Sequence, residues 1–324
     1  MKQDTLQELC SENTVDINYA LEATQEPVWK AIDILLRRTG EVESIRADVE
    51  QNEFVRNIAE NNLVAKTIIW LKAFRDVAKG LMETNSMHYR ITKKDGLYYH
   101  TWEHHIEYME RFVFSKLLPF NNFVLVEPCV SQLQRFEYKP FSIDLLKTTM
   151  LAVWFHDSHF VVGYSHNEED SAWMLHYVWS ELHEKFLGEG YIEQPSQKAL
   201  LTHACDIILL TAYHDRVQEN IVSEPTNVLS PKICAGIVLD ADLAGIAYST
   251  MFNRSNMLLE LESCKPQSDK LIKLKFIHNL LGRSNIYYQS PELENAARVN
   301  LIDYETSIIR AIRKSPVAKN SSRK

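Results

Sequence analysis

Glycine is scarce in this sequence, and its scarcity restricts the possible folds more than any other single feature. Only nine glycines occur among 324 residues, and residue pairs typical of tight turns are few. Long stretches rich in Leu, Ala, Glu and Lys lie between them, with apolar residues at helical spacing. Hydrophobic residues make up 45% and charged residues 24%, the usual range of a soluble globular protein. We therefore predict an all-α fold.

The charge and the cysteines argue against several classes of protein. A net charge of −8 disfavours binding of duplex nucleic acid, which needs an excess of Lys and Arg, although one basic cluster could still hold a nucleotide. The five cysteines are widely spaced and contain no C-x-x-C, so a reducing compartment is expected rather than a disulfide framework. The N-terminus is polar and no stretch reaches the ~20 apolar residues of a membrane span. We expect a cytosolic protein with no membrane partner.

The N-terminal part of the chain predicts helices without a chemical role. From Pro27 to about Leu81 the apolar residues follow a helical period, which breaks around Thr39 and Gly40. Two or three amphipathic helices are expected here. Their apolar faces would form an accessory layer or a contact in a homo-oligomer.

The stretch YYHTWEHHIEYM, residues 98–109, carries three histidines. On a helix, His100 and His104 would share one face, because residues four apart are neighbours. His105 would lie nearer the apolar side, packed or partly exposed. The pair His100/His104 therefore suggests a metal site, and with Glu103 it also matches the H-x-x-E-H pattern of zinc peptidases.

Two later stretches place acidic residues inside apolar helices. In WFHDSHF, His156 and Asp157 directly follow a buried helix, where a charged Asp is costly unless it is paired or bound to a metal. In GIVLDADLAGIA, Asp240 and Asp242 interrupt another apolar run. Imidazole and carboxylate are good joint ligands for zinc, manganese or iron. Either Asp240 or Asp242 could complete a site begun by two histidines and Asp157.

The order of these motifs resembles that of the HD-domain metal-dependent phosphohydrolases. A histidine, a His-Asp pair 52 residues later and an Asp 85 residues beyond all lie on helices expected to be buried. The resemblance runs from about Tyr98 to Glu305. It includes YHTWEHHI, LAVWFHD, NEEDSA, IILLTAYH and LDADLAGIA, in the order of a bacterial and phage-type group of predicted HD phosphohydrolases. It implies a helical HD bundle over 83–314, with a helical extension over 1–82 and a flexible basic tail over 315–324.

The resemblance also implies roles for individual residues. The metal ligands would be His104, His156, Asp157 and Asp242, with Asp240 in place of Asp242 as the alternative. They would hold one or two divalent ions (Mn, Co, Fe, Zn or Mg). His100 would protonate the leaving oxygen, and His214 would contact phosphate or a second ion.

The expected activity is hydrolysis of a phosphate ester in a nucleotide or related small metabolite, by water that the metal activates. Basic residues near the motifs could bind the phosphate, among them Lys94, Arg111 and Arg216. Glu168 and Glu169 open the next helix, where carboxylates are favourable in any case, and either could orient the water.

Two other functions remain open. A zinc peptidase would use Glu103 as its base and Glu168 or Glu169 as a third ligand, but it leaves His156 and Asp157 without a role. A non-catalytic HD scaffold that senses a nucleotide would keep the ligands without turnover. The segment YSTMFNRSNMLLELE, at 248–262, lacks the arginine pattern expected of the family there.

Overall fold

The computed structural model describes residues 27–48, 53–93, 97–122, 142–161, 165–187, 195–212, 230–262 and 266–314. These residues form helices and contain no strand, which confirms the predicted all-α class. The α-helices of the described part are α3 (Pro27–Leu36), α4 (Gly40–Asp48), α5 (Glu53–Lys93), α6 (Glu107–Asn122), α7 (Ile143–Phe155), α8 (Asn167–Leu187), α9 (Pro195–Thr211), α10 (Pro231–Leu243), α11 (Ser249–Glu262), α12 (Pro266–Leu281) and α13 (Glu294–Lys314). The tail over 315–324 lies outside the described residues.

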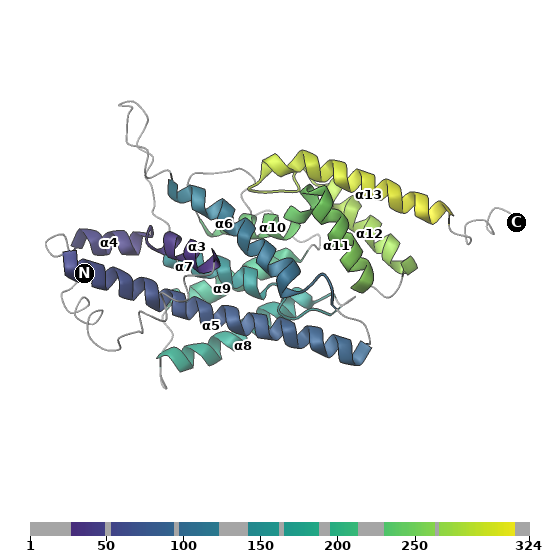
Figure 1. Cartoon of the computed structure of the whole chain (residues 1–324). Helices are drawn as coiled ribbons and strands as arrows, with labels where there is room; N and C mark the ends of the chain where they lie inside the picture. Colours follow the sequence, from purple (N-terminus) through teal and green to yellow (C-terminus); the bar gives the residue numbers. More distant parts are fainter. Residues whose placement is uncertain are drawn as a thin grey trace, which may run out of the picture.

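The N-terminal helices form as the sequence predicts but do not stand apart from the rest. The helical period breaks between α3 and α4, where the Thr39 hydroxyl donates to the Leu36 carbonyl (2.8 Å). The next helix, α5, is 41 residues long and runs alongside α7 and α8 (Figure 1). The expected division between residues 82 and 83 falls inside α5. The N-terminal helices are therefore part of the main body.

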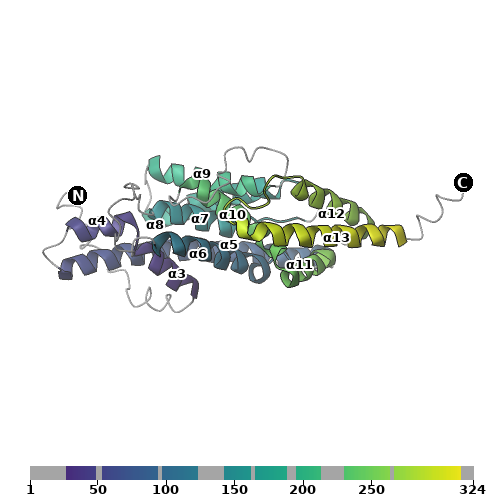
Figure 2. The same ribbon diagram turned by 90° about the horizontal axis from the view of Figure 1, so that it is seen from above.

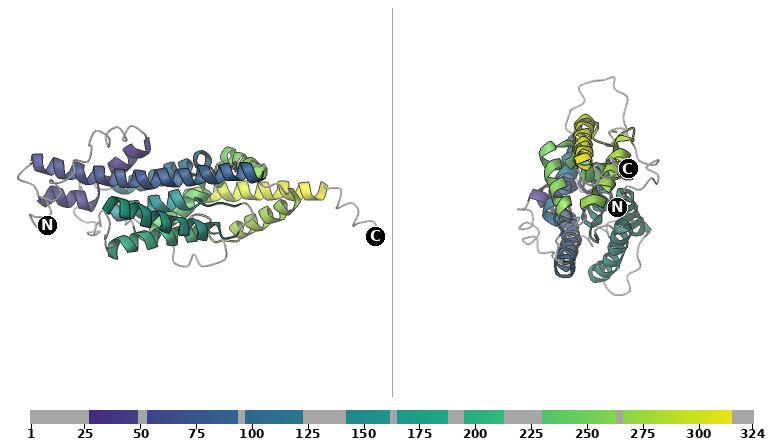
Figure 3. Two further views of the ribbon diagram at one scale, coloured as in Figure 1. Left: turned by 90° about the horizontal axis from the view of Figure 1, so that it is seen from below. Right: turned by 90° about the vertical axis from the view of Figure 1, so that its right-hand side faces the viewer.

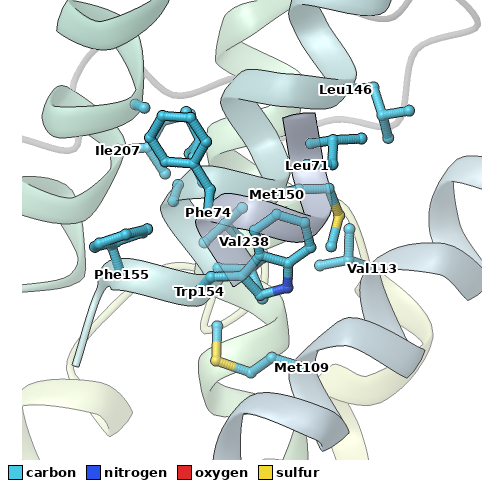
Figure 4. Packing of buried hydrophobic residues seen from close by; sticks show 14 of the residues in the cluster. Leu71, Phe74, Met109, Val113, Leu146, Met150, Trp154, Phe155, Ile207 and Val238 are labelled. Carbon is cyan, nitrogen blue, oxygen red and sulfur yellow. The ribbon is translucent and has the colours of Figure 1, made fainter. Parts of the chain in front are cut away.

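One core joins most of these helices. It reaches from Trp29 in α3 to Ala244, the residue that follows α10. Figure 4 shows Phe74 of α5, Trp154 of α7 and Val238 of α10 converging in it. Nearly every side chain of α7 is buried, as its apolar sequence predicts. The segments that carry the motif residues are thus fixed by close packing.

The C-terminal helices α11, α12 and α13 pack around a second cluster, which runs from Leu243 to Ile308. They lie together at one end of the elongated molecule, while α3 and α4 lie toward the other (Figures 2 and 3). A short 3₁₀ helix, η2 (Ala244–Ala247), connects the two clusters and packs against α13. Within the described ranges, no single helix is long and apolar enough to cross a membrane.

Candidate metal centre

Three helix ends bring histidines and aspartates together. His156 and Asp157 directly follow the last residue of α7, and His105 lies in a short π-helix, η1 (Trp102–Ile106), just before α6. Asp242 is near the end of α10. Serine caps fix where both α-helices begin, because the side chains of Ser142 and Ser230 accept backbone N–H groups of the first turns (3.1 and 3.4 Å). We call His105, His156, Asp157 and Asp242 the His–Asp group.

The ligand atoms of this group face one another at short range. The Nε2 atoms of His105 and His156 are 3.0 Å apart, and they lie 3.4 and 3.2 Å from Asp157 Oδ2. Asp242 Oδ1 is 3.1 Å from His105 Nε2 and 4.0 Å from His156 Nε2. Ligand atoms that share one ion through bonds of about 2.0–2.2 Å lie roughly 3–3.5 Å apart. His105, His156 and Asp157 are buried and could hold a metal ion.

The outer nitrogen of His156 fixes which ring atom faces the group. Its Nδ1 lies 3.0 Å from the Val153 carbonyl oxygen, which can only accept, so Nδ1 carries a proton and donates it. In the neutral ring, Nε2 then keeps a lone pair directed at Asp157 and His105. Metal-binding histidines commonly have their other nitrogen held in this way. The donor atoms of the group therefore fit a divalent cation.

Charges within the group shift its proton affinities. Burial alone would raise the pKa of Asp157, but His156, and then His100 and His105, outweigh it and hold the pKa below its usual range. Burial would lower the pKa of His156, whereas Asp157 and Asp242 raise it to about 9. Burial also opposes the lowering of the Asp242 pKa that His105 and His156 cause. Without an ion, a proton takes the position between His156 and Asp157.

The sequence suggested His104 as the metal ligand and His105 as a packed or partly exposed residue, and the structure reverses these two positions. His105 is buried in the group, whereas His104 is exposed and its Nδ1 lies 3.3 Å from an Arg254 nitrogen. The cause is the π-helix, in which the Glu107 N–H bonds to the Trp102 carbonyl five residues back. The wider turn changes the direction of each side chain relative to a regular helix. One feature of the sequence could have identified His105. It lies on the apolar side of the stretch, and the His–Asp group lies within the core.

His100 does not share a helix with His104, contrary to the assumption behind the pair. It precedes Thr101, the N-cap of η1. Its ring stacks on Phe160, with centroids 3.5 Å apart, and its centroid is 6.1 Å from that of His105. It is close enough for its charge to act on Asp157. His100 therefore lies next to the His–Asp group, in the segment that precedes η1.

The two candidate aspartates of α10 have different surroundings. Asp240 is fully buried and accepts from the backbone N–H groups of Tyr288 and Gln289, both at 2.7 Å. Its carboxylate thus ties the segment before α13 to α10. Asp242, two residues further along, reaches His105, with Oδ1 3.1 Å from Nε2. The geometry selects Asp242 over Asp240 as the partner of the histidines.

Glu168 lies close enough to the group for the charges of Asp157 and Asp242 to act on it. It lies in the first turn of α8, and burial together with the charges of Asp157 and Asp242 raises its pKa. The preceding residue, Asn167, is the first residue of α8. Its side-chain amide pairs with the backbone N–H and carbonyl of Val161 (2.8 and 3.1 Å), which ties the start of α8 to the segment after Asp157.

Three residues suggested as phosphate contacts, Lys94, His214 and Arg216, lie outside the described residues. The H-x-x-E-H pattern gains no support from the geometry, because His104 is exposed and the metal-capable residues are His105, His156 and Asp157. No family model, curated protein or solved structure matches the chain. The chemistry of the His–Asp group therefore has to be inferred from its own residues.

Proposed function

We propose that this protein is a cytosolic, metal-dependent phosphohydrolase of the HD-domain type, acting on a nucleotide or a related small phosphorylated metabolite. The observation that carries the proposal is the convergence of two imidazoles and two carboxylates from η1, α7 and α10. A His-Asp pair at the end of one buried helix, with an Asp on another, is the arrangement that the sequence resemblance implies. His105 takes the place that the sequence assigned to His104.

The residues of the group would hold the ion and leave room for substrate. His105 and His156 supply ring nitrogens, and Asp157 and Asp242 supply carboxylate oxygens. A divalent ion bound there would activate water and offset negative charge on the phosphoryl oxygens. Two imidazoles and two carboxylates do not fill the coordination sphere of Mn, Co, Fe or Mg, which take up to six ligands.

Two further residues would move protons. His100 lies close enough to Asp157 for its charge to act there, and it would donate a proton to the leaving oxygen, a role that histidine takes most often among side chains. Glu168, whose pKa is raised by burial and by Asp157, would hold or accept a proton of the attacking water. These roles place an acid and a base on residues that flank the ligands.

The test measures metal content and hydrolysis together. Purified protein is assayed for bound transition metal, and then with Mn²⁺, Co²⁺ or Mg²⁺ on mononucleotides, triphosphates, cyclic nucleotides and p-nitrophenyl phosphate. We expect bound metal and turnover in the wild type, and loss of both in Asp157→Ala. Asp303→Ala, an exposed aspartate of α13, is the matched control. Metal without turnover on any ester would contradict the activity and indicate a nucleotide-sensing scaffold.

A further inference from the structure

A small pocket adjoins the His–Asp group on the other side of η1. It has a volume of about 210 Å³ and lies between the η1–α6 segment and α11. His104 lines it, while the next residue, His105, points into the His–Asp group. Tyr99 also lines it, and the Tyr99 ring lies 4.9 Å from the ring centroids of both His100 and His105. The pocket and the His–Asp group therefore share a wall.

The charged side chains of the pocket are balanced in sign. Glu103 and Glu107 contribute two carboxylates from the η1–α6 segment, and Arg111 and Arg254 contribute two guanidinium groups. Arg111 lies 3.9 Å from Glu107, and Arg254 lies against His104. Because the two carboxylates offset the two guanidinium groups, the pocket has no excess positive charge to hold a highly anionic group, such as the outer phosphates of a triphosphate.

The balance suits an uncharged group with hydroxyls. A hydroxyl donates to a carboxylate and accepts from a guanidinium, so both kinds of side chain would be satisfied. Tyr108, Met251 and Leu258 add apolar surface to the pocket. Pockets for drug-sized ligands range over about 300–1,000 Å³, so this smaller pocket matches a single sugar ring or nucleoside.

We infer that this pocket binds the non-phosphate part of the substrate, and that this part is a small, uncharged, hydroxyl-bearing group such as a ribose ring. The inference rests on the proposed phosphohydrolase activity and narrows it to monophosphates over polyphosphates. Glu103 and Arg254 are then specificity residues, which touch the substrate away from the reacting phosphate. A ribonucleoside and a free sugar share this chemistry, and the test separates them.

The test measures binding without turnover. D-Ribose and the four common ribonucleosides are titrated into the full chain, and binding is followed by saturation-transfer NMR and calorimetry. We expect the wild type to bind at least one of them. Glu103→Lys and Arg254→Ala should each weaken that binding tenfold or more. The matched controls Glu181→Lys and Arg310→Ala alter exposed residues of α8 and α13 and should bind as the wild type does.

A second measurement separates this inference from the activity. In the presence of Mn²⁺, Glu103→Lys should shift the ratio of kcat/KM values toward the triphosphate and away from the monophosphate by tenfold or more. If p-nitrophenyl phosphate is hydrolysed but no probe binds, or the two pocket variants bind like the wild type, the pocket assignment is overturned while the activity stands. If a probe binds as expected but no ester is hydrolysed, the pocket stands and the proposed activity falls.

Discussion

Two buried polar clusters lie within a few residues of each other along the same helices, and they are built differently. In the first, Glu110 of α6 accepts from Arg75 through two bonds (2.7 and 3.1 Å) and from the Trp154 indole (2.7 Å). In the second, two residues beyond Trp154, His156 and Asp157 meet His105. Glu110 has a donor for each of its oxygens. The second cluster brings acceptor atoms together.

The difference teaches how a buried site for a ligand can be told from a buried structural network. Around Glu110, positive and negative groups match, so the network is satisfied by the protein alone. Around Asp157, imidazole nitrogens and carboxylate oxygens converge, and they need a proton or a cation between them. The first arrangement contributes to folding, whereas the second would be stabilised by an ion that binds to it.

The largest effect should come from breaking the satisfied network. Glu110→Ala removes the carboxylate that accepts from the half-buried Arg75 guanidinium and from the buried Trp154 N–H, so we expect a loss of about 3–5 kcal/mol in the free energy of unfolding. Urea denaturation measures it. Glu83→Ala, at an exposed position of α5, serves as the control and should change stability by less than about 0.5 kcal/mol. A loss as small as that for Glu110→Ala would show that the network is not structural.

A somewhat smaller effect on stability, that of added metal, should distinguish the His–Asp group from the cluster around Glu110. With Mn²⁺ at 100 times its dissociation constant, the wild type should gain about 2.7 kcal/mol in the free energy of unfolding. Asp157→Ala should gain nothing, and Glu110→Gln should still gain stability if it folds. Thermal unfolding with and without Mn²⁺ gives the comparison. Equal stabilisation of wild type and Asp157→Ala by the ion would place the metal elsewhere.

The metal-free protein should also lose stability as the pH rises. The pKa of His156 is raised from 6.5 to about 9, so its protonated form contributes stability that is complete below about pH 6.5 and lost as the pH approaches 9. The expected decline is about 2–3 kcal/mol, measured by urea unfolding at each pH in a chelator. His156→Gln should flatten the curve. Excess Mn²⁺ should also remove the decline, since an ion that takes the place of the proton binds better as the pH rises.

The smallest expected effect distinguishes the two adjacent histidines. His104→Ala should leave metal stoichiometry unchanged and alter stability by less than about 0.5 kcal/mol, because its side chain is exposed. His105→Ala should abolish metal binding. Metal content by mass spectrometry, with each variant purified identically, decides between them. Retention of metal by His105→Ala together with its loss in His104→Ala would restore the assignment made from the sequence.

Most of the fold could be predicted because it depends on local patterns. The helical period located α3 and its break before α4, and the uninterrupted apolar run of α7 predicted its burial. The inclusion of the N-terminal helices in the main body was not predictable in the same way. Contacts such as that between Arg75 and Glu110 join residues 35 apart, and no local pattern reveals them.

The candidate site was predictable where burial conflicts with charge. His156 and Asp157 stand out because they directly follow an apolar helix, and Asp242 because it interrupts one. His105 was missed because its orientation depends on the π-turn in η1, which the sequence does not signal. The choice between Asp240 and Asp242 required the backbone of Tyr288 and Gln289, 48 and 49 residues from Asp240.

The length of α5 has a consequence for how the protein is made. Its apolar side chains, among them Leu71 and Phe74, pack against α7. Synthesis of α7 ends about 60 residues after that of α5. At roughly 5–20 residues per second, that surface waits several seconds for its partner. The nascent chain therefore passes through a stage in which the long helix α5 has only α3 and α4 to pack against, and a chaperone that holds such surfaces would raise the yield of folded protein.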